Sequence, residues 1–158
     1  MLNLNNNELT FEINGYQKYR SNEDDSWANT TWMIKNEFIQ YESSSYDLES
    51  IEVDRLKDMF KKFISGQMNE MEVFVPLEPA FKIRFYPKGD EYGLWYKTVD
   101  VKEPIIKPNI EVIVHLVDSK HCITESSYSY ILEKEEVAKF YNYLVDITEW
   151  YNIIIQLD

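Results

Sequence analysis

Apolar residues recur with two different periods in this chain, and the order of those periods limits the possible folds. An alternating period of two, typical of a half-buried strand, runs through residues 9–17 and ends near Gly15. Helical spacing of three and four residues occurs at about 50–66 and 134–150. Further strand patterns cover residues 27–40, 72–77, 81–86, 92–99, 110–117 and 128–132. Strands outnumber helices and do not alternate with them regularly. The sequence therefore predicts an α+β fold, a mainly antiparallel β-sheet with two amphipathic helices packed on it, as a single domain over residues 1–158.

The first helical segment is recognisable from its ends and its apolar stripe. Ser50 is the expected N-cap of the first helix, and Gly66 is expected to end it. The stripe of that helix comprises Leu56, Met59, Phe60, Phe63 and Ile64. After the second helix, the run Ile153–Ile155 is too apolar to remain in solvent. We expect this tail to dock, either as an added strand or as an ordered extension.

The segment 21–54 is acidic, and we expect it to be rich in loops. Residues 20–26 form a polar turn or loop, and the strand pattern loses its register around Asn36, which indicates a hairpin or a bulge there. Residues 42–49 are polar and rich in serine.

Composition places the chain among folded proteins of the reducing cytoplasm. Its 158 residues are 44% hydrophobic and 15% aromatic, a composition that excludes a wholly disordered chain. The single Cys122 cannot form an internal disulfide, and no signal peptide is recognisable, so we expect a cytoplasmic location. The longest apolar runs are far shorter than the roughly 20 residues that a membrane helix needs.

The charge of the chain limits its partners. Sixteen basic against 28 acidic residues give a net charge of −12. Such a chain is repelled by nucleic acid and by anionic membranes, whereas a basic protein would be attracted to it. Segment 21–54 alone holds nine acids and one base, a net charge of −8, interspersed with Trp and Tyr. Aromatic anchors among steering acids suit a binding face for a basic protein, although a charge run is also typical of a merely solvated face. The predicted partner-binding residues are Glu23, Asp24, Asp25, Trp27, Asp47 and Glu49.

No constellation of residues in the sequence indicates catalysis, a metal site or a cofactor. His115 lies within an apolar strand pattern, and His121 and Cys122 are neighbours whose side chains would point apart on a strand. No second Cys or His has metal-ligand spacing, and no Gly-rich phosphate loop is present. We therefore predict that the chain is not an enzyme and that it binds no metal or cofactor. The alternatives left open are a non-catalytic ligand- or protein-binding domain of other purpose and, less favoured, a hydrolase that uses a carboxylate pair.

Several of these features occur together in a known family. Gly15-Tyr16-Gln17 closes the first strand, and an acidic loop leads through Trp27-Ala28-Asn29 to Trp32-Met33-Ile34. An amphipathic helix, the run Phe74-Val75-Pro76-Leu77-Glu78-Pro79-Ala80-Phe81 and a C-terminal helix follow. From about Leu9 to Trp150 this order resembles the WapI-type immunity proteins of bacterial polymorphic toxin systems.

The resemblance implies a function and a role for its motif residues. Proteins of that family are small and cytoplasmic, are encoded beside a large exported toxin, and neutralise the C-terminal domain of that toxin without a chemical step. It thus implies a toxin domain as the partner. Nuclease toxins are typically basic, so an acidic inhibitor would complement their charge. We interpret the following motif residues as mainly structural: Gly15, Tyr16, Gln17, Trp32, Glu78 and Pro79. Taken alone, the Glu78-Pro79 pair predicts a bend or bulge at a sheet edge.

Overall fold

The strands of the protein form two separate antiparallel sheets. The computed structural model describes residues 1–17, 27–88, 108–117 and 123–155. The first sheet has the order β1-β2-β3-β4 and the second the order β5-β6-β7-β8. The elements are β1 (Leu2–Leu4), the short 3-10 helix η1 (Asn5–Asn7), β2 (Leu9–Asn14), β3 (Trp27–Lys35), β4 (Gln40–Glu49), α1 (Ser50–Ile64), β5 (Glu72–Phe74), β6 (Phe81–Tyr86), β7 (Asn109–Val117), β8 (Ile123–Leu132) and α2 (Lys134–Ile155). The predicted α+β class with antiparallel strands and two helices is confirmed.

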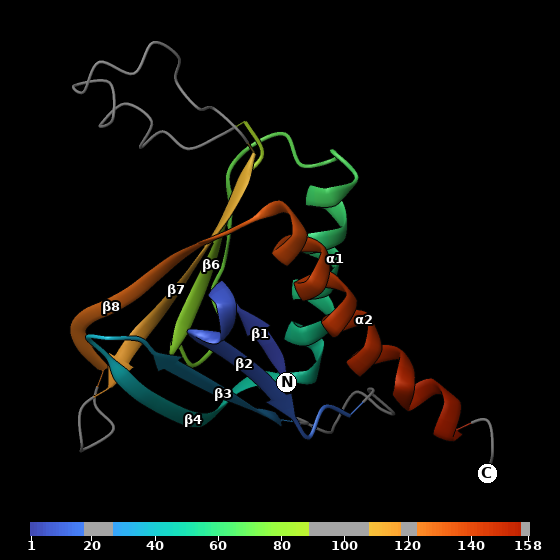
Figure 1. Cartoon of the computed structure of the whole chain (residues 1–158). Coiled ribbons are helices and arrows are strands. Elements are labelled where there is room, and N and C mark those ends of the chain that lie inside the picture. Colours follow the sequence, from blue (N-terminus) through green and yellow to red (C-terminus); the bar gives the residue numbers. More distant parts are fainter. Residues whose placement is uncertain (18–26, 89–107, 118–122, 156–158) are drawn as a thin grey trace.

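The hydrophobic core lies between the two sheets and the two helices. The helices lie side by side against one face of the second sheet, and the first sheet closes the core at the lower end of that sheet (Figure 1). Phe140 of α2 stacks on Phe60 of α1 and on Phe11 of β2, with ring centroids 4.7 and 5.3 Å apart. Phe11 also stacks on Trp32 of β3 at 4.2 Å, and Trp32 contacts Phe81 of β6 at 5.2 Å. One chain of rings thus joins both sheets and both helices.

The region between the first strand and the first helix is more regular than predicted. The hairpin expected around Asn36 is present: Asn36 Oδ1 accepts hydrogen bonds from the backbone N–H groups of Phe38 and Ile39, both at 2.9 Å. The prediction that segment 21–54 is rich in loops is wrong for its described part, because residues 40–49 form strand β4. Backbone pairing with β3 holds this polar strand, and Leu48 fixes its register by entering the core.

The ends of the helices differ in detail from the expected positions. The N-cap of α1 is Glu49, because its side chain and that of Glu52 form a reciprocal capping box. Ser50 is the first helical residue instead. Gly66 follows the end of the helix with φ +69°, as expected. The tail expected as a strand or an extension is helical as far as Ile155, where α2 ends.

The second sheet agrees with the predicted strands except at its first edge. Strand β5 stops at Phe74 rather than reaching Leu77, because Pro76 offers no N–H for a ladder and the chain turns toward α1. Strands β6, β7 and β8 confirm the other three patterns. The predicted turn at 20–26 and the predicted strand at 92–99 lie outside the described residues.

Candidate functional site

The predicted partner-binding residues gather in part at one corner of the molecule. Trp27 at the start of β3 lies directly opposite Glu49 at the end of β4. Asp47 lies two positions before Glu49 on β4. Glu23, Asp24 and Asp25 lie outside the described residues. The structure therefore brings two predicted residues into cross-strand register, beside the N-terminus of α1.

The acids at this corner also hold the backbone together. The Glu49 carboxylate accepts the backbone N–H of Glu52, so part of its hydrogen-bonding capacity stabilises the helix. In return, Glu52 Oε2 accepts the N–H of Glu49 at 3.1 Å, while Glu52 Oε1 accepts the N–H of Leu77 at 3.0 Å. One carboxylate thus joins the end of β4, the first turn of α1 and the segment after β5.

The first motif packs against the same half of α1. Gly15 has φ +79°, which an L-residue rarely adopts, and this turn carries the chain from β2 onto the helix. The Tyr16 hydroxyl donates to Asp54 Oδ2 at 3.0 Å, and Ser50 Oγ accepts the N–H of Gln17 at 3.2 Å. Burial, and then the neighbouring Asp54 carboxylate, raise the pKa of Tyr16 above its usual range.

The remaining motif residues have different surroundings. Trp32 is buried in the ring cluster of the core. Glu78 and Pro79 are exposed in the connection between β5 and β6, where the Glu78 carbonyl accepts the N–H of Ala80 at 2.8 Å. That contact is a tight turn at the edge of the second sheet.

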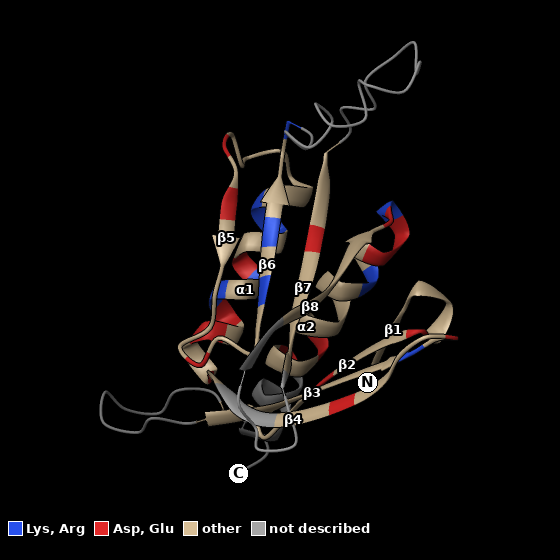
Figure 2. Ribbon diagram, turned by 90° about the vertical axis from the view of Figure 1, so that its left-hand side faces the viewer, with Lys and Arg blue, Asp and Glu red and all other residues tan. Residues whose placement is uncertain are grey.

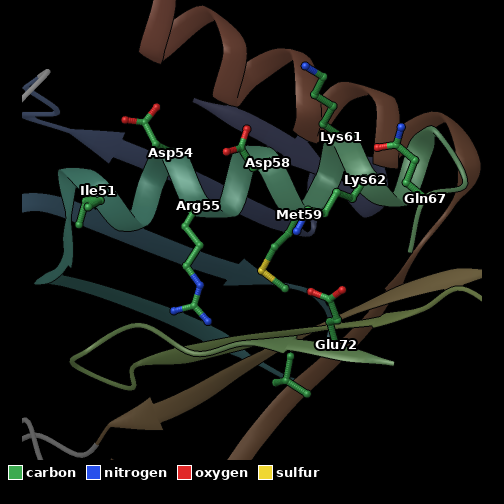
Figure 3. Close-up of a pocket in the computed structure, with 10 residues that line it drawn as sticks. Ile51, Asp54, Arg55, Asp58, Met59, Lys61, Lys62, Gln67 and Glu72 are labelled. Atoms are coloured by element: carbon green, nitrogen blue, oxygen red, sulfur yellow. The ribbon is translucent and has the colours of Figure 1, made fainter. Parts of the chain in front are cut away.

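A groove of about 690 Å³ runs between α1 and β5, and we refer to it as the α1–β5 groove (Figure 3). Its lining residues are Ile51, Asp54, Arg55, Asp58, Met59, Lys61, Lys62, Gln67, Glu72 and Val73. Arg55 and Met59 point from the helix toward β5, and Glu72 rises from β5 toward Met59. The Arg55 guanidinium lies over the ring of Phe74, 5.7 Å from its centroid.

The carboxylates of the groove do not form a catalytic pair. Both oxygens of Asp54 are engaged, one by Tyr16 and the other by Lys57 Nζ at 3.1 Å. Asp58 points from α1 away from β5, whereas Glu72 projects from β5 into the groove, so these two carboxylates do not converge (Figure 3). This geometry does not favour a hydrolase that uses two acids. None of the described residues that line the groove is a tyrosine.

Exposed large apolar side chains occur on α1 and in the segments beside β5, the two elements that border this groove. Among the described residues, eight large apolar side chains are exposed, and five of these lie on α1 or in the segments on either side of β5. They are Ile51, Ile64, Met71, Val75 and Leu77. Scattered exposed apolar residues are normal, and only those that lie next to one another form a surface typical of protein binding. The sequence pattern placed Ile64 on the apolar stripe of its helix, but this side chain is 50% exposed. The other four were not singled out from the sequence, although Ile51 lies off that stripe and this position was a usable signal.

Acidic positions are spread over several elements in the described part of the chain. Figure 2 shows red segments on α1, β4, β5 and β7, whereas β6 carries blue, basic segments. These are Lys82 and Arg84, and Arg84 makes an ion pair with Glu111 at 3.2 Å. Over residues 1–17, 27–88, 108–117 and 123–155, no group of three His, Cys, Asp or Glu side chains is arranged to hold a metal ion.

Comparison with known proteins assigns the chain to a family. Residues 1–152 match the family model described as the immunity protein WapI-like family. The chain belongs to this family. The match covers nearly the whole length, including both sheets and almost all of α2, and it confirms the resemblance noted in the sequence. No curated protein and no solved structure matches the chain.

Membership limits what this protein does. Immunity proteins are generally non-catalytic, so the prediction that the chain is not an enzyme is confirmed by the family. Membership also implies neutralisation of a toxin and therefore binding of a cognate toxin. In the described part of the chain, no helix is both long enough and apolar enough to cross a membrane.

Proposed function

We propose that this WapI-like family member neutralises the C-terminal domain of a toxin encoded beside it by forming a one-to-one complex in the cytoplasm. In this proposal the partner is basic, and the acidic surface of segment 21–54 attracts it. The family match over residues 1–152 carries the proposal of neutralisation. The net charge of −8 in segment 21–54 supports the acidic mechanism.

Charge complementarity acts chiefly on the rate of association. Like-signed charges on one face steer an oppositely charged partner into encounter, and they raise the association rate most strongly at low salt. The pairing of Trp27 with Glu49 supports this role, since it brings an aromatic side chain beside an acid at the end of the first sheet. We expect Glu23, Asp24, Asp25 and Asp47 to contribute charge, and Trp27 to contribute contact area.

Titration calorimetry with the purified toxin domain, at low and at high salt, tests the proposal. We expect one-to-one binding, with an association rate that falls at high salt when measured by stopped flow. A triple variant, Glu23→Lys with Asp24→Lys and Asp25→Lys, is expected to slow association at least tenfold. The matched control reverses three exposed acids of α2: Glu135→Lys, Asp146→Lys and Glu149→Lys.

Three results would contradict parts of this proposal. Absence of binding to the neighbouring toxin domain would remove the proposed function altogether. Tight binding that is insensitive to salt would leave neutralisation intact and remove the acidic mechanism. An equal slowing by the α2 control would show that net charge acts as a whole, rather than through segment 21–54.

A further inference from the structure

We propose that three exposed apolar residues anchor the toxin domain. They lie at the end of the α1–β5 groove that is next to the N-terminus of α1. These are Ile51, Val75 and Leu77, and we refer to them as the apolar corner. This inference rests on the proposed function and names the contact surface for it. The occupant is a basic protein domain that presents an apolar side chain surrounded by Lys or Arg.

The exposure of these side chains is the first observation. Ile51 is 57% exposed, Val75 is 44% exposed and Leu77 is 62% exposed. They come from two elements, the first turn of α1 and the segment after β5, which meet where Glu52 holds the Leu77 N–H. Covering such side chains removes apolar surface from water and so favours a complex. Interface energy of this kind is concentrated in a few such anchors.

The corner is rigid, which is the second observation. The Leu77 backbone is fixed to Glu52, and Glu52 is fixed to Glu49 in the capping box. Between the two exposed residues of this segment, Pro76 is buried, and its ring restricts the backbone. Phe74, just before them, is fully buried and lies under the Arg55 guanidinium. A surface ordered before binding loses little conformational entropy when a partner docks.

The charge around the corner identifies its occupant. Glu78 is exposed beside Leu77, and Glu49 and Glu52 lie at the adjoining end of β4 and α1. Among the described residues, these three acids outnumber the nearby base Arg55, which lies over Phe74. Trp27 lies opposite Glu49, so the predicted acidic binding face adjoins the apolar corner. An apolar centre with an acidic rim complements an apolar centre with a basic rim. A second copy of this chain would instead bring acid against acid, at a net charge of −12 on each copy.

Paired substitutions test this surface against exposed apolar residues elsewhere. We compare Ile51→Ala with Leu77→Ala against a control that combines Phe38→Ala with Ile131→Ala, whose side chains are 91% and 51% exposed. The corner variant is expected to bind the toxin domain at least 100-fold more weakly, mainly through faster dissociation. The control variant is expected to stay within about threefold of the wild type.

The outcomes separate this inference from the proposed function. If the wild type does not bind the toxin domain, the proposed function fails. If the wild type binds and the corner variant binds as tightly as the control, the inference alone is overturned. Hydrogen exchange on the wild-type complex gives a second reading that needs no variant. Protection of residues 50–56 and 74–79 on binding supports the corner, whereas protection confined to other segments overturns it.

Discussion

The Tyr16 hydroxyl and the Asp54 carboxylate are joined by a 3.0 Å hydrogen bond that ties the first motif of the chain to the N-terminal half of α1. Lys57 donates to the other oxygen of the same carboxylate, and its ammonium also donates to Thr148 of α2 at 3.0 Å. A turn after β2 and two helices are therefore connected through one acid. Asp54 therefore has a structural role, although aspartate is a residue type that is common on protein surfaces.

The first prediction concerns this hydrogen bond. Tyr16→Phe removes the donor while keeping the buried ring, so we expect the free energy of unfolding to fall by about 0.5–1.5 kcal/mol. Urea unfolding monitored by circular dichroism measures it. Tyr141→Phe is the matched control, because Tyr141 is a partly buried tyrosine of the core for which no comparable bond is found in the described residues. An equal fall in the free energy of unfolding of both variants would mean that the hydrogen bond between Tyr16 and Asp54 does not stabilise the fold.

The second prediction concerns Glu52. Glu52→Ala removes the acceptor for the N–H groups of both Glu49 and Leu77. We expect a loss of about 1–2 kcal/mol in the free energy of unfolding, together with faster hydrogen exchange at residues 75–79. Asp58→Ala, an exposed acid of the same helix, is expected to cost less than about 0.5 kcal/mol. Unchanged exchange at residues 75–79 would show that other contacts hold this segment.

The third prediction concerns the ring cluster. Phe140 is fully buried and contacts the rings of Phe11 and Phe60, so Phe140→Ala leaves a cavity where the first sheet meets both helices. We expect destabilisation by about 3–5 kcal/mol, measured by thermal and urea unfolding. Phe38→Ala, at a side chain that is 91% exposed, is expected to change stability by less than about 0.5 kcal/mol. A small loss at Phe140 would mean that the core collapses around the missing ring.

The fourth prediction concerns alkaline pH. Burial raises the pKa of Tyr143 to about 12, against the opposing effect of the N–H that Ile13 donates to its hydroxyl at 2.8 Å. A raised pKa means that the folded state holds the Tyr143 proton more tightly than the unfolded state does. The contribution of this proton to the free energy of unfolding is therefore fully present below about pH 10. It is then lost as the pH rises toward 12.

Unfolding measured between about pH 8 and pH 11 checks this sign. Tyr143→Phe is expected to be less stable than the wild type at the lower pH, because it loses the bond from Ile13. Its stability is expected to fall less steeply above pH 10. Parallel curves for the two proteins would contradict the assignment to Tyr143.

Local patterns were sufficient for the elements whose signals lie within a few residues. The alternation of Leu9, Phe11 and Ile13 predicted β2, and the spacing of Leu56, Met59 and Phe60 predicted the buried face of α1. Each of these patterns records one face turned toward the core. Strand β4 was not predicted, because its polar residues carry no such alternation and it is held by backbone pairing with β3.

The family and the class of fold were determined by the sequence alone, since both depend on the order of short motifs along the chain. The contacts of the candidate site were decided by the tertiary structure. Glu52 and Leu77 are 25 residues apart, and only the packing of β5 beside α1 brings them within hydrogen-bonding distance. The apolar corner likewise depends on which face of each element is already covered. Burial is a property of the assembled fold, because it depends on residues that lie far apart in the sequence.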